Sequence, residues 1–304
     1  MEGKFACLKF AENMAEIPIK PEFIRKAPKK ILNWYMSKFM PYAVREIEIC
    51  SRQGYEILLP TLAKENAGLL EKIMEKVEAA CIELGVKAML AESGIYVSGN
   101  FFVPEGRLVK AFFLKQIIDK YLKTSAIKAE SAELIIIAGD ENYTKAIIEF
   151  LYRSFNYVGV ILEGEDQGDY EEISAEIFDD CGLVLNFGRR GSYLLKDADI
   201  IVNLSEVTKG YESFYKKGAC YIELAGEKEK LKNLLAKREG ITAVDKFNVE
   251  YMGERLGLIQ YEMLVFLEQP DFMRCFQGKN IRRSFPLAAE SLEKYSVKVR
   301  NLNI

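Results

Sequence analysis

Hydrophobic and polar positions follow two different periods along the chain, and these periods predict alternating strands and helices. Residues 45–60 alternate at every second position and predict two strands that meet in a hairpin turn at Gln53–Gly54. Residues 64–85 carry apolar side chains at three- and four-residue spacing, which predicts a helix ended by Gly85. Further predicted elements in this half are a helix within 29–42, a strand over 86–93 and a helix over 107–123.

The alternation becomes sharper from Glu133 onward. Residues 134–139, LIIIAG, form a short, wholly apolar run of the kind that is buried on both faces in a parallel sheet. Strands spaced by helical patterns predict βαβ units with right-handed crossovers. The predicted strands are 134–139, 158–163, 182–187, 199–205 and 219–226, and the predicted helical pieces are 142–155, 173–178 and 228–239.

These patterns predict an α/β fold with a C-terminal Rossmann-like parallel sheet and an N-terminal α/β domain. The small, polar segment 124–133 is the best candidate linker. The tail predicts one helix over 253–269 and another after Pro286. We therefore expect an N-terminal domain over 1–128, a Rossmann-like domain over 129–248, and C-terminal helices over 249–304 that pack back on the N-terminal domain.

The turn after the first strand of the predicted Rossmann-like domain departs from the dinucleotide pattern G-x-G-x-x-G. Its three positions fall on Gly139, Glu141 and Thr144. The first glycine permits the tight turn, and Thr144 is small enough to stand in for the third. Glu141, with Asp140 beside it, would repel a phosphate by roughly 3 kcal/mol at about 5 Å. Both acids also suit the first turn of a helix, where they cap N–H groups, so a phosphate site is disfavoured.

Glu163 follows the second strand of this domain and fits the dinucleotide pattern better. It lies where an acidic residue would accept hydrogen bonds from an adenosine ribose. Residues 163–180 hold nine acidic side chains and no basic one, so a nicotinamide cofactor would be NAD and not NADP. A solvated acidic face explains the same composition.

Several polar residues are candidates because of their position. Asn203 and Ser205 lie at the carboxyl end of a predicted strand, where open α/β sheets bind ligands. Arg189 and Arg190 form a basic loop for a carboxylate or phosphate, or else pair with nearby acids. Residues 20–30 carry five basic side chains, which indicate a solvated face or a site for an anion or partner.

Composition excludes several classes of catalytic site, metal site and partner. The 304 residues are 49% hydrophobic and 29% charged, with a net charge of −3, so nothing calls for nucleic acid. Histidine is absent, which excludes histidine bases and histidine-ligated metals. Six cysteines without C-x-x-C predict no metal site and suggest small core residues. We expect a cytoplasmic protein without a secretory signal or a membrane partner, and leave homo-oligomers open.

Residues 191–205, GSYLLKDADIIVNLS, resemble the helix–strand segment of Rossmann dehydrogenases. Residues 133–245 as a whole look like the cofactor domain of the shikimate/amino-acid dehydrogenase-like superfamily. That resemblance implies an α/β substrate domain in front and C-terminal helices that cross back to it. Shikimate dehydrogenases also carry N-V-T-x-P-x-K with a catalytic lysine. The nearest stretch here, EILLPTLAK, contains Pro60 and Lys64 at a longer spacing than the motif has.

Three functions are consistent with this sequence. The first is an NAD-dependent dehydrogenase of the shikimate/amino-acid type. The second is a binding module that keeps a nucleotide or small-ligand crevice without catalysis. The third is a non-catalytic interaction protein derived from a dehydrogenase. Fold alone does not decide among them, because such sheets host many activities.

Overall fold

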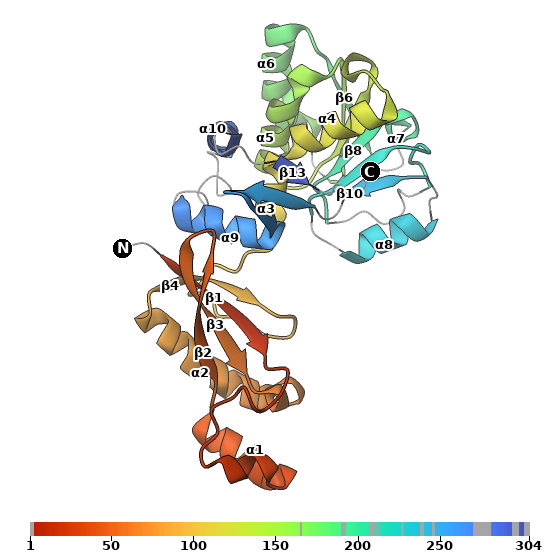
Figure 1. Cartoon of the computed structure of the whole chain (residues 1–304). Coiled ribbons are helices and arrows are strands. Elements are labelled where there is room, and N and C mark those ends of the chain that lie inside the picture. The colour runs from red at the N-terminus through yellow and green to blue at the C-terminus, as the bar shows by residue number, and fades with distance from the viewer. Residues whose placement is uncertain are drawn as a thin grey trace. The chain divides into compact units, whose positions relative to one another are not determined.

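A computed structural model of the chain describes residues 3–164, 166–189, 193–206, 211, 213–225, 228–237, 240–244, 247–269, 281–293 and 298–300. The chain divides into two compact units (Figure 1). The first comprises the residues up to Glu105 together with helix α9 (Leu258–Glu268), which joins it from Ile259 onward. The second comprises residues 106–258 and the described residues after 270.

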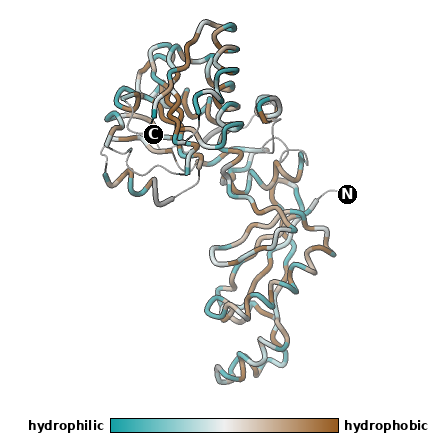
Figure 2. Tube along the Cα trace, turned by 180° about the vertical axis from the view of Figure 1, so that it is seen from behind, coloured by the Kyte–Doolittle hydropathy of each residue, from teal (hydrophilic) through white to brown (hydrophobic). Residues whose placement is uncertain are grey.

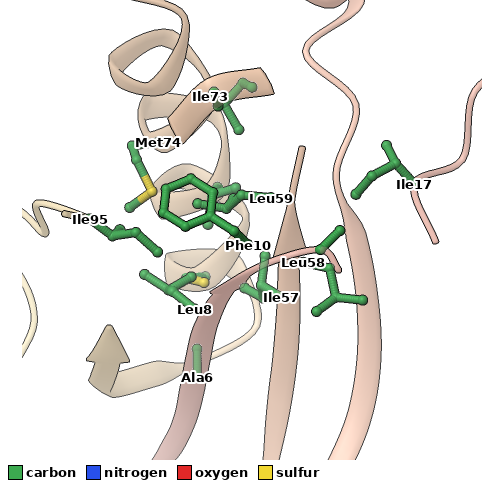
Figure 3. Close-up of a cluster of buried hydrophobic side chains, with 14 of the residues drawn as sticks. Ala6, Leu8, Phe10, Ile17, Ile57, Leu58, Leu59, Ile73, Met74 and Ile95 are labelled. Atoms are coloured by element: carbon green, nitrogen blue, oxygen red, sulfur yellow. The ribbon is translucent and has the colours of Figure 1, made fainter. Parts of the chain in front are cut away.

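The first unit is built on a four-stranded mixed sheet of order β2-β3-β1-β4. Strand β1 is parallel to β3 and β4, and β2 is antiparallel to β3. Helix α2 buries its apolar face, including Ile73 and Met74, with Leu8 and Ile57 of the sheet in one core (Figure 3). Each such fully buried side chain contributes about 1.5–3 kcal/mol. The bounds are β1 (Lys4–Phe10), η1 (Glu22–Lys26), α1 (Lys29–Phe39), β2 (Ala43–Ile49), β3 (Arg52–Leu59), η2 (Thr61–Glu65), α2 (Ala67–Glu83) and β4 (Val86–Ala91).

The hairpin predicted between residues 45 and 60 is present, but its turn is not at Gln53–Gly54. The turn lies at Cys50 and Ser51, whose φ angles are 47° and 61°. Two positive φ angles in succession match a type I′ turn, which suits the twist of a two-residue hairpin. Gly54 instead lies within β3, where an added Cβ would stand 2.5 Å from the Phe5 ring. The glycine makes room for an aromatic ring, so the turn prediction was wrong.

The second unit contains a six-stranded sheet of order β10-β9-β8-β5-β6-β7, in which every pairing is parallel. In chain order this is 6-5-4-1-2-3, the strand order of dinucleotide-binding sheets. The predicted α/β class with a Rossmann-like sheet is therefore confirmed. Figure 2 shows hydrophobic chain at the centre of this unit, as expected for strands covered on both faces. The bounds are β5 (Glu133–Ile137), α5 (Glu141–Leu151), β6 (Tyr157–Leu162), α6 (Glu171–Cys181), β7 (Leu185–Arg189), α7 (Leu194–Asp197), β8 (Ile200–Asn203), β9 (Cys220–Glu223), α8 (Lys228–Lys237) and β10 (Thr242–Val244).

Two helices, α3 and α4, precede this sheet within the same unit. The predicted helix over 107–123 breaks at Phe113 into these two helices. The segment 124–133 then runs from the end of α4, through the short helix η3, to the start of β5. The bounds are α3 (Arg107–Phe112), α4 (Leu114–Ser125) and η3 (Ala129–Ser131).

The tail differs from its predicted helices in two places. Residues 254–257 form strand β12 in a small antiparallel sheet, and helix α9 begins only at Leu258. Helix α10 starts before Pro286 and contains it. In the first unit, α9 stacks Phe266 on Phe102 at 4.2 Å between ring centroids. In the second, α10 packs on α5. The bounds are β11 (Asn248–Tyr251), β12 (Glu254–Gly257), α10 (Ile281–Glu293) and β13 (Lys298–Arg300).

Cysteine side chains mostly serve the core, as the sequence suggested. Cys7, Cys50, Cys81 and Cys220 are buried, whereas Cys181 is exposed and Cys275 lies outside the described residues. Burial raises the pKa of Cys220 to about 12, so this thiol stays protonated at neutral pH. Among the described residues, no helix has the length and apolar character needed to cross a bilayer.

We expect Gly54→Ala to lower the free energy of unfolding by about 1–3 kcal/mol, the usual cost of overpacking a core. Phe5 is fully buried, so its ring has no room to move away from the new methyl group. Chemical denaturation followed by circular dichroism measures the change. The matched control is Gly99→Ala, where an added Cβ meets no atom within 4 Å. Equal stability of the two variants would contradict this account of Gly54.

Candidate functional site

A cavity of about 430 Å³ opens at the carboxyl ends of the parallel strands in the second unit. It lies beside the loops that follow β5, β8 and β9 and the first turn of α5. Strands β5 and β8 are neighbours whose chain connections run in opposite directions, which is the topological switch point where such sheets bind ligands. The lining residues are Leu108, Gly139, Asp140, Tyr143, Leu204, Glu206, Leu224, Ala225 and Ile281.

Gly139 holds the loops after β5 and β8 together. A Cβ at this position would lie 2.1 Å from the carbonyl oxygen of Leu204. No side chain fits in that space, so the glycine is required by the contact between two backbone segments. The first glycine of the predicted motif thus has a structural role that needs no ligand.

Side chains at the start of α5 accept hydrogen bonds from two N–H groups of the turn that leads into this helix. The Asp140 carboxylate accepts from the Tyr143 N–H at 2.9 Å, as an N-cap. The buried Thr144 hydroxyl accepts from the Gly139 N–H at 3.1 Å and donates to the Asp140 carbonyl at 2.8 Å. The Thr144 N–H donates to the same carbonyl. Two N–H groups of the turn, those of Gly139 and Tyr143, are therefore engaged by side chains of the chain itself, where a dinucleotide turn offers N–H groups to phosphate.

Of the two neighbouring acids in the turn, Asp140 lines the cavity and Glu141 does not, although the glycine pattern pointed to Glu141. Glu141 forms an ion pair with Lys145 one turn further along α5. Lys145 is buried, and its ammonium group lies 5.5 Å from the centre of the Tyr170 ring. Asp140 lines the cavity directly, and Glu206 adds a second carboxylate to the lining. The lining contains no basic side chain among the described residues.

These residues do not fit the pyrophosphate of a dinucleotide. The second glycine position is Glu141, the Gly139 and Tyr143 N–H groups are engaged by side chains, and the cavity lining carries two acids. A phosphate placed against Asp140 would meet repulsion of roughly 3 kcal/mol at about 5 Å. The cofactor that the fold family implies therefore does not match this turn.

A buried polar cluster lies beneath the cavity, at the ends of β8 and β9. Asn203 and Glu223 are paired in register on these strands. The Asn203 amide donates to both Glu223 carboxylate oxygens, at 3.1 and 2.9 Å, and to the Ser205 carbonyl at 3.1 Å. The Glu223 carboxylate also accepts from the Tyr221 hydroxyl at 2.8 Å and from the Ala225 N–H at 2.7 Å. A buried carboxylate with this many donors is a fixed structural acid.

Ser205 connects this cluster to Glu163. Its N–H donates to the Asn203 amide oxygen at 3.2 Å, and its hydroxyl donates to the Glu163 carboxylate at 2.6 Å. The structure thus brings together three of the predicted residues, from the ends of β6 and β8. Glu163 as a ribose acceptor and Ser205 as a ligand contact stay predictions. One oxygen of the Glu163 carboxylate already has a partner in the chain.

Sequence patterns missed Glu223, Tyr221 and Lys110. Lys110 in α3 is buried and donates to the Glu223 carbonyl at 2.7 Å. Burial and the neighbouring Glu223 carboxylate raise the pKa of Tyr221 well above its usual range. The signal for Glu223 was a lone acid in the apolar strand CYIE, because an acid there needs buried partners.

Other predicted charged residues lie apart from the cavity lining. Arg189 is exposed at the end of β7, and Arg190 lies outside the described residues. In the first unit, Lys64 pairs with Glu92 at 3.5 Å and Pro60 caps η2.

Part of the acidic segment 163–180 is engaged in ion pairs. Glu172 and Glu176 pair with Arg282 of α10, which also binds Glu149. The described residues contain no cluster of three or more potential metal ligands.

No family model and no curated protein sequence matches the chain. Among solved structures, shikimate 5-dehydrogenase from Listeria monocytogenes, in complex with shikimate and NAD, aligns over 94% of this chain and 96% of its own. Its identity is 7% and its TM-score 0.35. L-tryptophan dehydrogenase from Nostoc punctiforme aligns over 96% and 80%, with 12% identity and a TM-score of 0.39. The chain therefore has a distant structural likeness to NAD-dependent dehydrogenases, and the strand order carries the fold assignment.

We expect Asn203→Asp to destabilise the protein by about 2–4 kcal/mol at neutral pH, because it places a second carboxylate against buried Glu223. The loss should shrink as the pH falls, since one proton shared by the two acids removes the repulsion. Thermal melts across pH 4–8 test this. Asn156→Asp, at an exposed amide, is the control. A loss that is independent of pH would contradict the pairing.

Proposed function

We propose that the second unit binds a small, neutral or cationic ligand in the switch-point cavity, and that it does not bind a dinucleotide. The observation that carries this proposal is the Asp140 carboxylate, which caps α5 and lines the cavity at the place where a dinucleotide-binding turn receives phosphate.

The size and lining of the cavity support a ligand of nucleoside size. About 430 Å³ falls within the range of roughly 300–1,000 Å³ that small-molecule pockets occupy. Leu108, Leu204, Leu224, Ala225 and Ile281 offer apolar contact to a ring or a short aliphatic chain. Asp140 and Glu206 are acceptors for hydroxyl or amino groups, as carboxylates are for ribose in related folds.

A comparison of compounds that share one base, with and without phosphate, tests the proposal. Adenosine, AMP and NAD are added separately at millimolar concentration, and the melting temperature is measured for each. A ligand present at 100 times its dissociation constant stabilises by about 2.7 kcal/mol. We expect adenosine to raise the melting temperature more than AMP or NAD does, because the two acids of the lining repel the phosphates of both nucleotides.

The variant Asp140→Asn tests the negative charge of this side chain separately from its role as the N-cap of α5. Asparagine keeps an acceptor for the Tyr143 N–H but removes the negative charge. We expect it to raise the affinity for AMP by about tenfold while the melting temperature without ligand changes little. Asp169→Asn, at an exposed acid away from the cavity lining, should leave AMP binding unchanged.

Two outcomes would overturn the proposal. A large stabilisation of the unaltered protein by NAD would show a working dinucleotide site. No response to any of the three compounds, nor to a panel of amino acids, polyamines and sugars, would show that the cavity binds no small molecule of this class. The interaction-protein alternative would then be favoured.

A further inference from the structure

Helix α1 lies at one end of the first unit (Figure 1). Large apolar side chains of α1 and of the short helix η1 are exposed to solvent. Phe23 is 71% exposed, Trp34 56%, Phe39 47% and Ile31 46%. The Trp34 and Phe39 rings are neighbours, with 6.5 Å between their centroids, and exposed apolar side chains that adjoin one another indicate a binding face. We define the α1 patch as these four residues with the exposed lysines Lys26, Lys30 and Lys38.

Lysine and apolar side chains are interleaved within the α1 patch. Residues 30, 31, 34 and 38 recur at helical spacing, so they share one face of α1. The Lys38 ammonium lies 5.2 Å from the Trp34 ring centre and 5.8 Å from that of Phe39. Tyr35 and Met36, on another face of the helix, are buried in the core of the unit. These two buried side chains attach α1 to the core, and Phe39 at the end of α1 also packs on Tyr35, with 4.6 Å between ring centroids.

Charge around the patch is strongly one-sided. Residues 20–40 contain six basic side chains and one acid, whereas the whole chain has a net charge of −3. Helix α1 itself contains no acidic residue. This local excess of positive charge complements a negatively charged surface and opposes a positively charged one.

We propose that the α1 patch adsorbs to an anionic lipid surface. Indole and phenyl rings beside lysine ammonium groups match the headgroup region, where rings and phosphates lie at the same depth. A protein partner typically meets an apolar centre surrounded by a polar rim, and here the two kinds of side chain are mixed. The sequence predicted no membrane partner because it has no spanning segment, but surface adsorption requires none. The proposal is independent of the cavity in the second unit.

Trp34 is the only tryptophan in the chain, so its emission reports on the patch alone. The full-length protein is titrated with vesicles of phosphatidylcholine, either pure or containing phosphatidylserine. We expect a shift of the emission to shorter wavelength and protection from acrylamide quenching with the anionic vesicles only. Binding should weaken at high salt, because exposed charges are screened beyond about 10 Å at 0.1 M.

Matched charge reversals identify the contact. Lys26→Glu combined with Lys30→Glu should lower vesicle binding at least about tenfold, since each lysine near an anionic surface adds about one factor of five in affinity. The acid introduced at position 30 would lie in the first turn of α1, where negative charge favours the helix, so folding should be retained. Lys123→Glu with Lys128→Glu, at exposed positions of the second unit, should bind as the unaltered protein does.

Other outcomes would overturn the proposal. An emission shift with polyglutamate and none with vesicles would identify an acidic polypeptide as the ligand. Equal binding to neutral and anionic vesicles, or equal loss in both double variants, would exclude the α1 patch as an electrostatic contact. No shift with any of these probes would show that the face is not an adsorption surface.

Discussion

The second unit depends on the close approach of Gly139 to the backbone of Leu204. This contact joins the loops after β5 and β8 at the point where chain connections diverge to the two sides of the sheet. Gly139 and Leu204 both line the cavity, so the wall between these loops is set by a backbone contact that no side chain can replace. Asn203 at the end of β8 and Glu223 at the end of β9 join these two strand ends through buried hydrogen bonds. The geometry of the cavity follows from these two constraints.

Two buried lysines of this unit bind partners within the fold and do not reach the cavity. The cavity lining therefore keeps an acidic character. Lys145 is engaged by Glu141, and Lys110 donates to the carbonyl of Glu223. Lys145 and Lys110 therefore have partners within the fold, and neither is in the cavity lining. Asp140 and Glu206 remain the charged groups of that lining among the described residues. The proposed preference of this cavity for neutral or cationic ligands rests on these two carboxylates.

Hydrophobic periodicity predicted the fold because each buried strand must be apolar on both faces, and 134–139 is. It could not place the hairpin turn, since Gly54 serves a contact with Phe5, which is distant in sequence. The start of α10 was missed because proline favours helix beginnings, whereas Phe285 packs against Phe112 at 4.8 Å and holds the preceding turn in the helix. Asn203 and Ser205 were found from their position after a strand. Glu223 was not, because its partner is defined only by the register between β8 and β9.

The turn after β5 indicates how such a fold can dispense with a phosphate without losing stability. A helix N-terminus carries partial positive charge and N–H donors, and a bound phosphate satisfies both. Here the Asp140 carboxylate provides the negative charge and accepts one N–H, while the Thr144 hydroxyl accepts another. An N-cap of this kind contributes about 1 kcal/mol. Because these intrachain groups supply the charge and the acceptors that a bound phosphate would supply, the turn is satisfied without a phosphate and the sheet keeps its architecture.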